Sequence, residues 1–136
     1  VSLYSQDVVV HEDTIKNNPG LVRRMVRALS RSKISSIENP EGALEAFWKD
    51  KPALKATSEA ANRDELRMSM SLFKDKLVGK YGQGFPVRSK VVSTQAAFVA
   101  AKSLPKEPVD NIYTDQFVKG LSRADKFPKH WGKFKN

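Results

Sequence analysis

The chain has 136 residues, of which 40% are hydrophobic and 29% charged, and its formal net charge is +9. This length suits one folded core, and the hydrophobic content is that of a globular protein. Cysteine is absent, which excludes disulfide bonds, thiolate metal ligands and a cysteine nucleophile. No stretch reaches the ~18 apolar residues that span a bilayer. The chain opens at Val1 with neither methionine nor signal peptide, so we expect a processed or shortened form of a longer protein.

The first ten residues are predicted to form one strand. Residues 1–4 and the β-branched run of residues 8–10 both favour extended backbone. A lone strand cannot form a sheet, so its partner must come from sequence outside this chain or from another copy. A strand-paired homodimer is therefore one expected assembly.

Two helices are predicted to begin with the same chemistry. Asn18 and Asn39 each precede a proline, which places an asparagine N-cap before a proline at the first helical position. Apolar residues follow both starts at helical spacing, and the second helix is expected to end near residues 51–52. The apolar positions are Leu21, Val22, Met25, Val26 and Leu29 in the first helix and Leu44, Phe47 and Trp48 in the second. Before them, residues 11–17 suit a short helical turn.

A further helix is predicted from about Ser58, because apolar residues recur there at steps of four, three and four. They are Leu66, Met70, Phe73 and Leu77. Gly79 follows as a candidate for the position just past the helix end. The glycines of residues 79–84 match neither the dinucleotide fingerprint nor the phosphate-binding loop, so we interpret them as a helix-terminating loop.

Two shorter helices complete the predicted body. Ser93 or Thr94 is expected to cap the first, which runs to about residue 101 before Pro105. Thr114 is expected to cap a last short helix that carries Phe117 and Val118. The predicted fold is therefore mostly α, with one N-terminal strand and four to five helices. We divide it into a strand (1–10), a helical region (11–118) and a basic aromatic tail (119–136).

Side chains with catalytic or metal-binding chemistry are sparse. His11 and His130 lie at opposite ends of the chain. The trio of residues 11–13 is better explained as a helix start, because acidic residues are favourable there and neighbouring side chains rarely share one ion. No serine lies in a Gly-x-Ser-x-Gly turn. We therefore predict no catalytic residue, no metal site and no cofactor.

Basic residues gather in two places. Arg23, Arg24, Arg27 and Arg31 form one face of the first long helix, which we interpret as a solvated surface. The tail interleaves lysines with Phe127, Trp131 and Phe134. That mixture occurs in proteins that bind single-stranded nucleic acid, but the aromatic rings can equally pack on the helical body while the lysines stay hydrated. Packing is the favoured interpretation, and a small basic nucleic-acid-binding module is the alternative function.

Four stretches together resemble the C-terminal part of periplasmic solute-binding proteins of the nitrate, sulfonate, taurine and thiamine-pyrimidine transport class. They agree in order and approximate spacing and cover most of residues 1–118. The stretches are Val-Val-Val-His-Glu-Asp-Thr-Ile at 8–15, Asn-Pro-Gly-Leu-Val-Arg-Arg-Met-Val-Arg-Ala at 18–28, Asn-Pro-Glu-Gly-Ala at 39–43 and Ile-Tyr-Thr-Asp-Gln-Phe at 112–117.

The resemblance implies the C-terminal portion of a two-lobed α/β fold of the type II periplasmic-binding kind. It implies capture of a small anionic or heterocyclic solute outside the cytoplasm for the membrane permease of an ABC importer. The N-terminal lobe would then be the main partner of this chain. The superfold also includes pyrimidine-forming synthases, for which His11 is the one placed candidate, but nothing else in the chain supports an enzyme.

The resemblance also places the residues that would contact the solute. The crossover at the start of the chain is the part nearest the cleft between the lobes, so Tyr4, Ser5 and Gln6, with Asp7 beside them, are the expected ligand-binding residues. Tyrosine can stack on a ring, and serine and glutamine can donate hydrogen bonds to it or to an anion. Backbone roles at a hinge are the alternative for the same residues.

Overall fold

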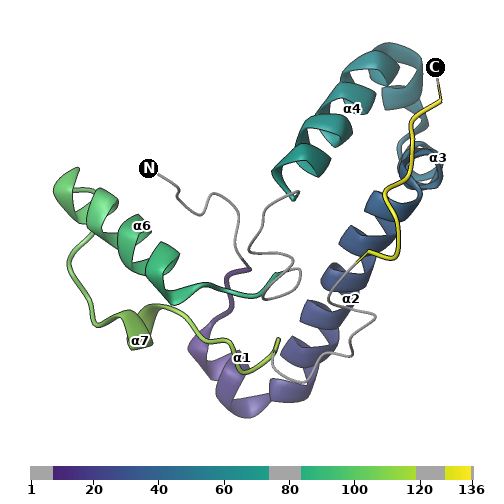
Figure 1. Ribbon diagram of the computed structural model, residues 1–136. Coiled ribbons are helices and arrows are strands. Elements are labelled where there is room, and N and C mark those ends of the chain that lie inside the picture. The colour runs from purple at the N-terminus through teal and green to yellow at the C-terminus, as the bar shows by residue number, and fades with distance from the viewer. Residues whose placement is uncertain (1–7, 74–83, 119–127, 136) are drawn as a thin grey trace. The chain divides into compact units, whose positions relative to one another are not determined.

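The structure is a computed structural model that describes residues 8–73, 84–118 and 128–135 (Figure 1). Within these ranges the regular elements are helices, which agrees with the predicted mostly α class. They are α1 (Glu12–Asn17), α2 (Pro19–Glu38), α3 (Pro40–Asp50), α4 (Pro52–Leu72), α6 (Arg88–Ala100) and α7 (Val109–Ile112). The chain divides into two compact units. Unit 1 comprises Val1–Arg27 and Gly84–Leu121, and unit 2 comprises Ala28–Gln83 and Ser122–Asn136.

The predicted N-terminal strand is not found in the part of it that the structure describes. Residues 8–10 are irregular, and residues 1–7 lie outside the described ranges. Val8 is 54% exposed and Val9 is 91% exposed. A β-branched run alone does not make a strand, because extended backbone needs a neighbouring strand to satisfy its hydrogen bonds.

Helices α1 and α2 both begin within unit 1, and α2 begins at the predicted Asn18–Pro19 start. The amide of Asp13 donates to Nδ1 of His11, the N-cap of α1, at 3.2 Å. The amide of Leu21 donates to Oδ1 of Asn18 at 3.1 Å. These side chains satisfy amides that have no partner inside the first turn of a helix.

The core of unit 2 forms around the junction of α2 and α3. Ile37 is fully buried, and Leu44 and Trp48 are 3% and 4% exposed. Helix α3 is capped as predicted, because the amide of Gly42 donates to Oδ1 of Asn39 at 3.0 Å. It ends at Asp50 and packs against α4.

The helix predicted from about Ser58 begins earlier than expected. Helix α4 starts at Pro52, where proline again occupies the first turn, and Ser58 interrupts it with φ −147° and ψ 24°. The predicted start is therefore the kink between two helical segments. Along the predicted stripe, Met70 is buried at 6% exposure, and α4 ends at Leu72. Leu77 and Gly79 lie outside the described residues.

The two last predicted helices were misplaced. Helix α6 begins at Arg88 and not at Ser93 or Thr94, and the Ser93 hydroxyl donates to the carbonyl of Ser89 within the helix. A serine inside a helix can bond to the preceding turn, so its presence does not fix a start. Thr114 does not begin a helix either. Its hydroxyl accepts from the amide of Gln116 in a turn, while the short helix α7 precedes it.

Candidate functional site

The expected ligand-binding residues Tyr4, Ser5 and Gln6 lie outside the described residues, and so does Asp7. What the structure does describe is the segment that leads from them into α1. This segment passes through residues 8–10 and ends at the His11 cap. Residues 8–11 are therefore the described residues that follow the predicted site in the sequence.

An apolar hollow of about 140 Å³ lies beside this segment. Its lining comes from the segment, from α1 and from the first two turns of α2, and comprises Val8, Val10, Thr14, Leu21, Val22, Met25 and Val26. Ligand pockets typically enclose about 300–1,000 Å³ and contain a few placed polar groups. This hollow is smaller and has the Thr14 hydroxyl as its one polar side chain, so by itself it fits an apolar side chain or ring edge better than a whole solute.

His11 has the structural role that the sequence indicated. Its Nδ1 accepts the hydrogen bond from the Asp13 amide at 3.2 Å, so this nitrogen is used in capping α1. The side chains of His11 and Asp13 are both exposed. Across the described ranges, no three histidine, aspartate or glutamate side chains gather closely enough to hold a metal ion.

A second polar contact in unit 1 joins the start of α6 to α7. The guanidinium of Arg88 donates through both terminal nitrogens to the carboxylate of Asp110. This pairing lowers the pKa of Asp110 and raises that of Arg88, for which Tyr113 is a further partner. Nearby, Gln95 donates to the carbonyl of Glu107 at 2.6 Å. Together these bonds fix the loop between α6 and α7, which precedes the Tyr-Thr stretch of the resemblance.

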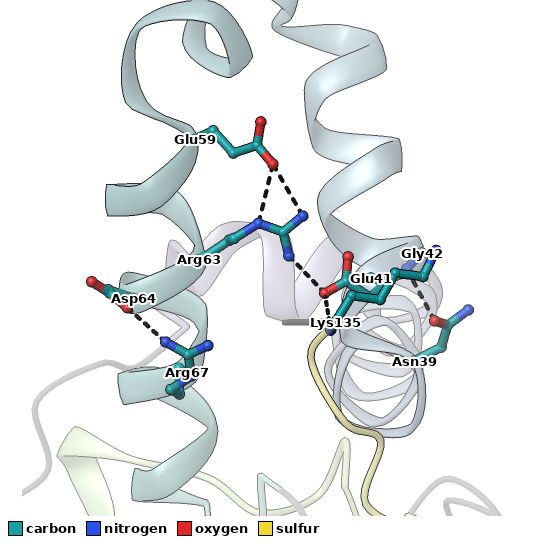
Figure 2. A network of polar contacts seen from close by, with 8 residues as sticks. All are labelled: Asn39, Glu41, Gly42, Glu59, Arg63, Asp64, Arg67 and Lys135. Carbon is teal, nitrogen blue, oxygen red and sulfur yellow. Dashed lines mark hydrogen bonds and ion pairs between the residues drawn. The ribbon is translucent and has the colours of Figure 1, made fainter.

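The densest polar network lies in unit 2 (Figure 2). Arg63 of α4 donates to Glu41 of α3 at 2.6 Å and to Glu59, one turn away on its own helix, at 3.1 Å. Glu41 also accepts the backbone amide of Lys135 at 2.9 Å. The Arg63 hydrogen bond, followed by that of Lys135, lowers the pKa of Glu41. The hydrogen bond to Glu41, followed by that to Glu59, raises the pKa of Arg63.

The buried Trp48 contacts the polar network around Arg63. Its indole nitrogen donates to Oδ1 of Asn62 at 3.1 Å. Lys55 and Arg63 lie over its ring, with the charged groups 5.2 Å and 5.3 Å from the ring centroid. The side chain is buried and every polar atom it carries has a partner, so it is built for packing between α3 and α4 rather than for contact with a solute.

The C-terminal segment, residues 128–135, contacts unit 2, and of the aromatic residues expected to pack there Phe134 does so, whereas Trp131 is 37% exposed. The guanidinium of Arg67 lies 4.7 Å from the centroid of the Phe134 ring. The amide of Gly132 donates to the carbonyl of Ile37 at 2.8 Å, and the amide of Lys129 donates to Glu38. Phe127 lies outside the described residues.

The network of Glu41, Glu59 and Arg63 was not predicted from the sequence. The spacing of Glu59 and Arg63 indicates a pair along one helix. Nothing in the sequence indicates that Glu41 and the C-terminal segment meet that pair, because 94 residues separate Glu41 from Lys135. The basic face of α2, in contrast, is exposed as predicted at Arg23, Arg24, Arg27 and Arg31.

Two comparisons relate the chain to known proteins. Residues 1–43 match the family model described as "NMT1/THI5 like". The chain is also 29% identical over 123 residues to the riboflavin-binding protein RibY of Chloroflexus aurantiacus. This similarity covers 89% of the chain and 35% of the relative, so the chain spans about a third of the relative's length. Both findings confirm the resemblance to solute-binding proteins that the sequence indicated.

No solved structure matches the chain. Over the residues that the structure describes, no helix has both the length and the apolar character needed to cross a membrane.

Proposed function

We propose that this chain is the C-terminal part of a solute-binding protein that captures a small heterocyclic or anionic solute outside the cytoplasm and delivers it to the permease of an ABC importer. The observation that carries the proposal is the similarity to RibY, which extends over 89% of the chain and so includes residues from both units. The relative is named for binding riboflavin. Riboflavin is therefore the first solute to test.

The family match adds support at the predicted site. It covers residues 1–43, which include Tyr4, Ser5 and Gln6 and the helices α1 and α2 that follow them. In our proposal Tyr4 stacks on the ring of the solute, and Ser5 and Gln6 hydrogen bond to its polar edge. The apolar hollow beside residues 8–10 contributes packing but not enclosure, and the other wall of the site belongs to a further lobe.

The test uses the product of the complete gene, purified without added solute. Riboflavin is titrated while its fluorescence is followed, and a calorimetric titration gives the stoichiometry. A panel of a thiamine-type pyrimidine, nitrate and a small sulfonate is titrated in parallel. We expect one saturable ligand with a stoichiometry of one, because a single cleft holds a single solute. The absence of saturable binding by every member of the panel would count against the proposed function.

The site is tested separately from the function. Tyr4→Ala and Ser5→Ala are expected to weaken binding about tenfold or more, which corresponds to roughly 1.4 kcal/mol. Tyr4→Phe keeps the ring and is the matched control for loss of the hydroxyl alone. If the natural protein binds a solute, and Tyr4→Ala and Ser5→Ala bind it with the same affinity, then the solute binds elsewhere on the protein. In that case only the site assignment is wrong.

A further inference from the structure

The C-terminal segment is held on unit 2 by backbone contacts at a regular spacing. The amides of residues 129, 132 and 135 donate respectively to the Glu38 carboxylate, the Ile37 carbonyl and the Glu41 carboxylate. The Ile37 carbonyl belongs to the last turn of α2, where carbonyls have no partner inside the helix. The segment therefore supplies bonds that the α2–α3 junction would otherwise obtain from water.

Gly132 is the point of closest approach. A Cβ atom at this position would overlap the carbonyl oxygen of Glu38 and Cδ of Pro40. Pro40 is fully buried, and the Glu38 oxygen is main chain, so neither can move without shifting the start of α3. Any larger residue at position 132 must lift the segment away from the helices.

The side chains of the C-terminal segment add further contacts and charge around Gly132. Phe134 lies against the guanidinium of Arg67, while Lys129, Lys133 and Lys135 are exposed. The acceptors on the other side are acidic, since two of the three are the carboxylates of Glu38 and Glu41. Opposite charges across a contact favour the correct partner, and hydrogen bonds to carboxylates are stronger than neutral ones.

We propose that the surface made by Ile37, Glu38, Pro40, Glu41 and Arg67 is a peptide-binding site and that its resident ligand is the chain's own residues 128–135. Its recognition rule is a basic peptide in non-helical conformation with three free amides at three-residue steps, a glycine at the central step and an aromatic residue two positions later. This site consists of residues of unit 2, whereas the proposed solute-binding residues belong to unit 1.

The test removes the resident ligand and returns it as a separate molecule. A variant that ends at residue 127 is mixed with a fluorescein-labelled peptide of residues 128–136, and binding is followed by fluorescence anisotropy. We expect saturable binding to the shortened chain and at least about tenfold weaker binding to the full chain, where the attached segment competes at high effective concentration.

Matched peptides identify the recognition rule. A Gly132→Ala peptide is expected to bind at least about tenfold more weakly than the natural sequence, and a Phe134→Ala peptide several-fold more weakly. Failure of the natural peptide to bind a folded shortened chain would overturn the proposal. So would equal affinity for the Gly132→Ala peptide.

Hydrogen exchange on the full chain provides a measurement that does not require the shortened chain to fold. The amides of residues 132 and 135 are expected to exchange at least about tenfold more slowly than in the free peptide, and Gly132→Ala should abolish this protection while leaving that of α6 unchanged. Exchange at the rate of the free peptide in the natural chain would show that the segment is not bound.

Discussion

The guanidinium of Arg63 lies 2.6 Å from the carboxylate of Glu41, although the two residues are 22 positions apart and belong to different helices. This bond connects the middle of α4 to the first turn of α3 (Figure 2). The side chain of Glu41 is largely buried at 11% exposure, and that of Arg63 is half-buried at 24% exposure. The pair therefore connects the two helices at a partly buried place.

The first prediction concerns the pH dependence of unit 2. The pKa of Glu41 in the folded protein lies below its ordinary value of 4.5, because Arg63 and the Lys135 amide stabilise the carboxylate. A lowered pKa gives stability that is complete above the unfolded value and is lost as the pH falls through the folded value. We expect the urea midpoint of unit 2, followed by tryptophan fluorescence, to fall progressively as the pH is lowered below the ordinary Glu41 value of 4.5.

The variant Glu41→Gln isolates this contribution, because other carboxylates titrate in both proteins. Its stability should be lower than that of the natural chain near neutral pH and should fall less steeply on acidification. Parallel pH profiles for the two proteins would show that Glu41 is not the group responsible.

The second prediction concerns the fully buried Ile37. Ile37→Ala should lower the free energy of unfolding by about 2–5 kcal/mol, because it removes three buried carbons and leaves a cavity. Leu29 lies on the same helix and is 42% exposed, so Leu29→Ala is the matched control, with an expected loss of about 0.5 kcal/mol or less. Urea denaturation monitored by circular dichroism measures both. Similar losses for the two variants would mean that Ile37 is not a core residue.

The third prediction concerns the cap of α3. Asn39→Ala removes the acceptor for the Gly42 amide and should destabilise the protein by about 1 kcal/mol. Asn39→Asp keeps an acceptor oxygen and should retain most of the stability. Thermal unfolding of the three proteins gives the comparison. A loss in Asn39→Asp as large as that in Asn39→Ala would show that the amide group matters for a reason other than capping.

The fourth prediction concerns the contact between Arg88 and Asp110. Asp110→Asn removes the charge that Arg88 binds, so the amides around residues 101–108 should exchange faster with solvent while those of α3 are unaffected. Because the pair is exposed, a small change in global stability is expected. Glu107→Gln is the control, since it changes a nearby charge but keeps the carbonyl to which Gln95 donates.

The sequence predicted most of the helices because their starts are local. Asn18 and Asn39 were identified as caps from the proline that follows each, and both side chains accept the expected amide. Capping chemistry involves residues two or three positions apart, so it can be recognised without knowledge of the fold. Apolar spacing, in contrast, placed the start of the next helix at about Ser58, whereas α4 begins at Pro52 and has a kink at Ser58.

The errors came where an element depends on distant residues or on a weak local preference. Residues 8–10 have the composition of a strand, but strand formation depends on a partner. Ser93 and Thr114 have the side chains of caps but different roles. The network of Glu41 and Arg63 joins three parts of the chain through tertiary packing, and no short pattern indicates it. The position of the expected ligand residues remains a prediction from resemblance alone.

The two tryptophans of the chain both belong to unit 2, where Trp48 is 4% exposed and Trp131 is 37% exposed. Tryptophan emission therefore reports on that unit alone, whereas the far-ultraviolet dichroism sums the helices of both. Any denaturation experiment that records the two signals together can distinguish one cooperative transition from two. If the two signals separate, the fluorescence curve reports the unfolding of unit 2, which includes the C-terminal segment. The remaining change in dichroism then reports the unfolding of unit 1, to which the proposed solute-binding residues belong.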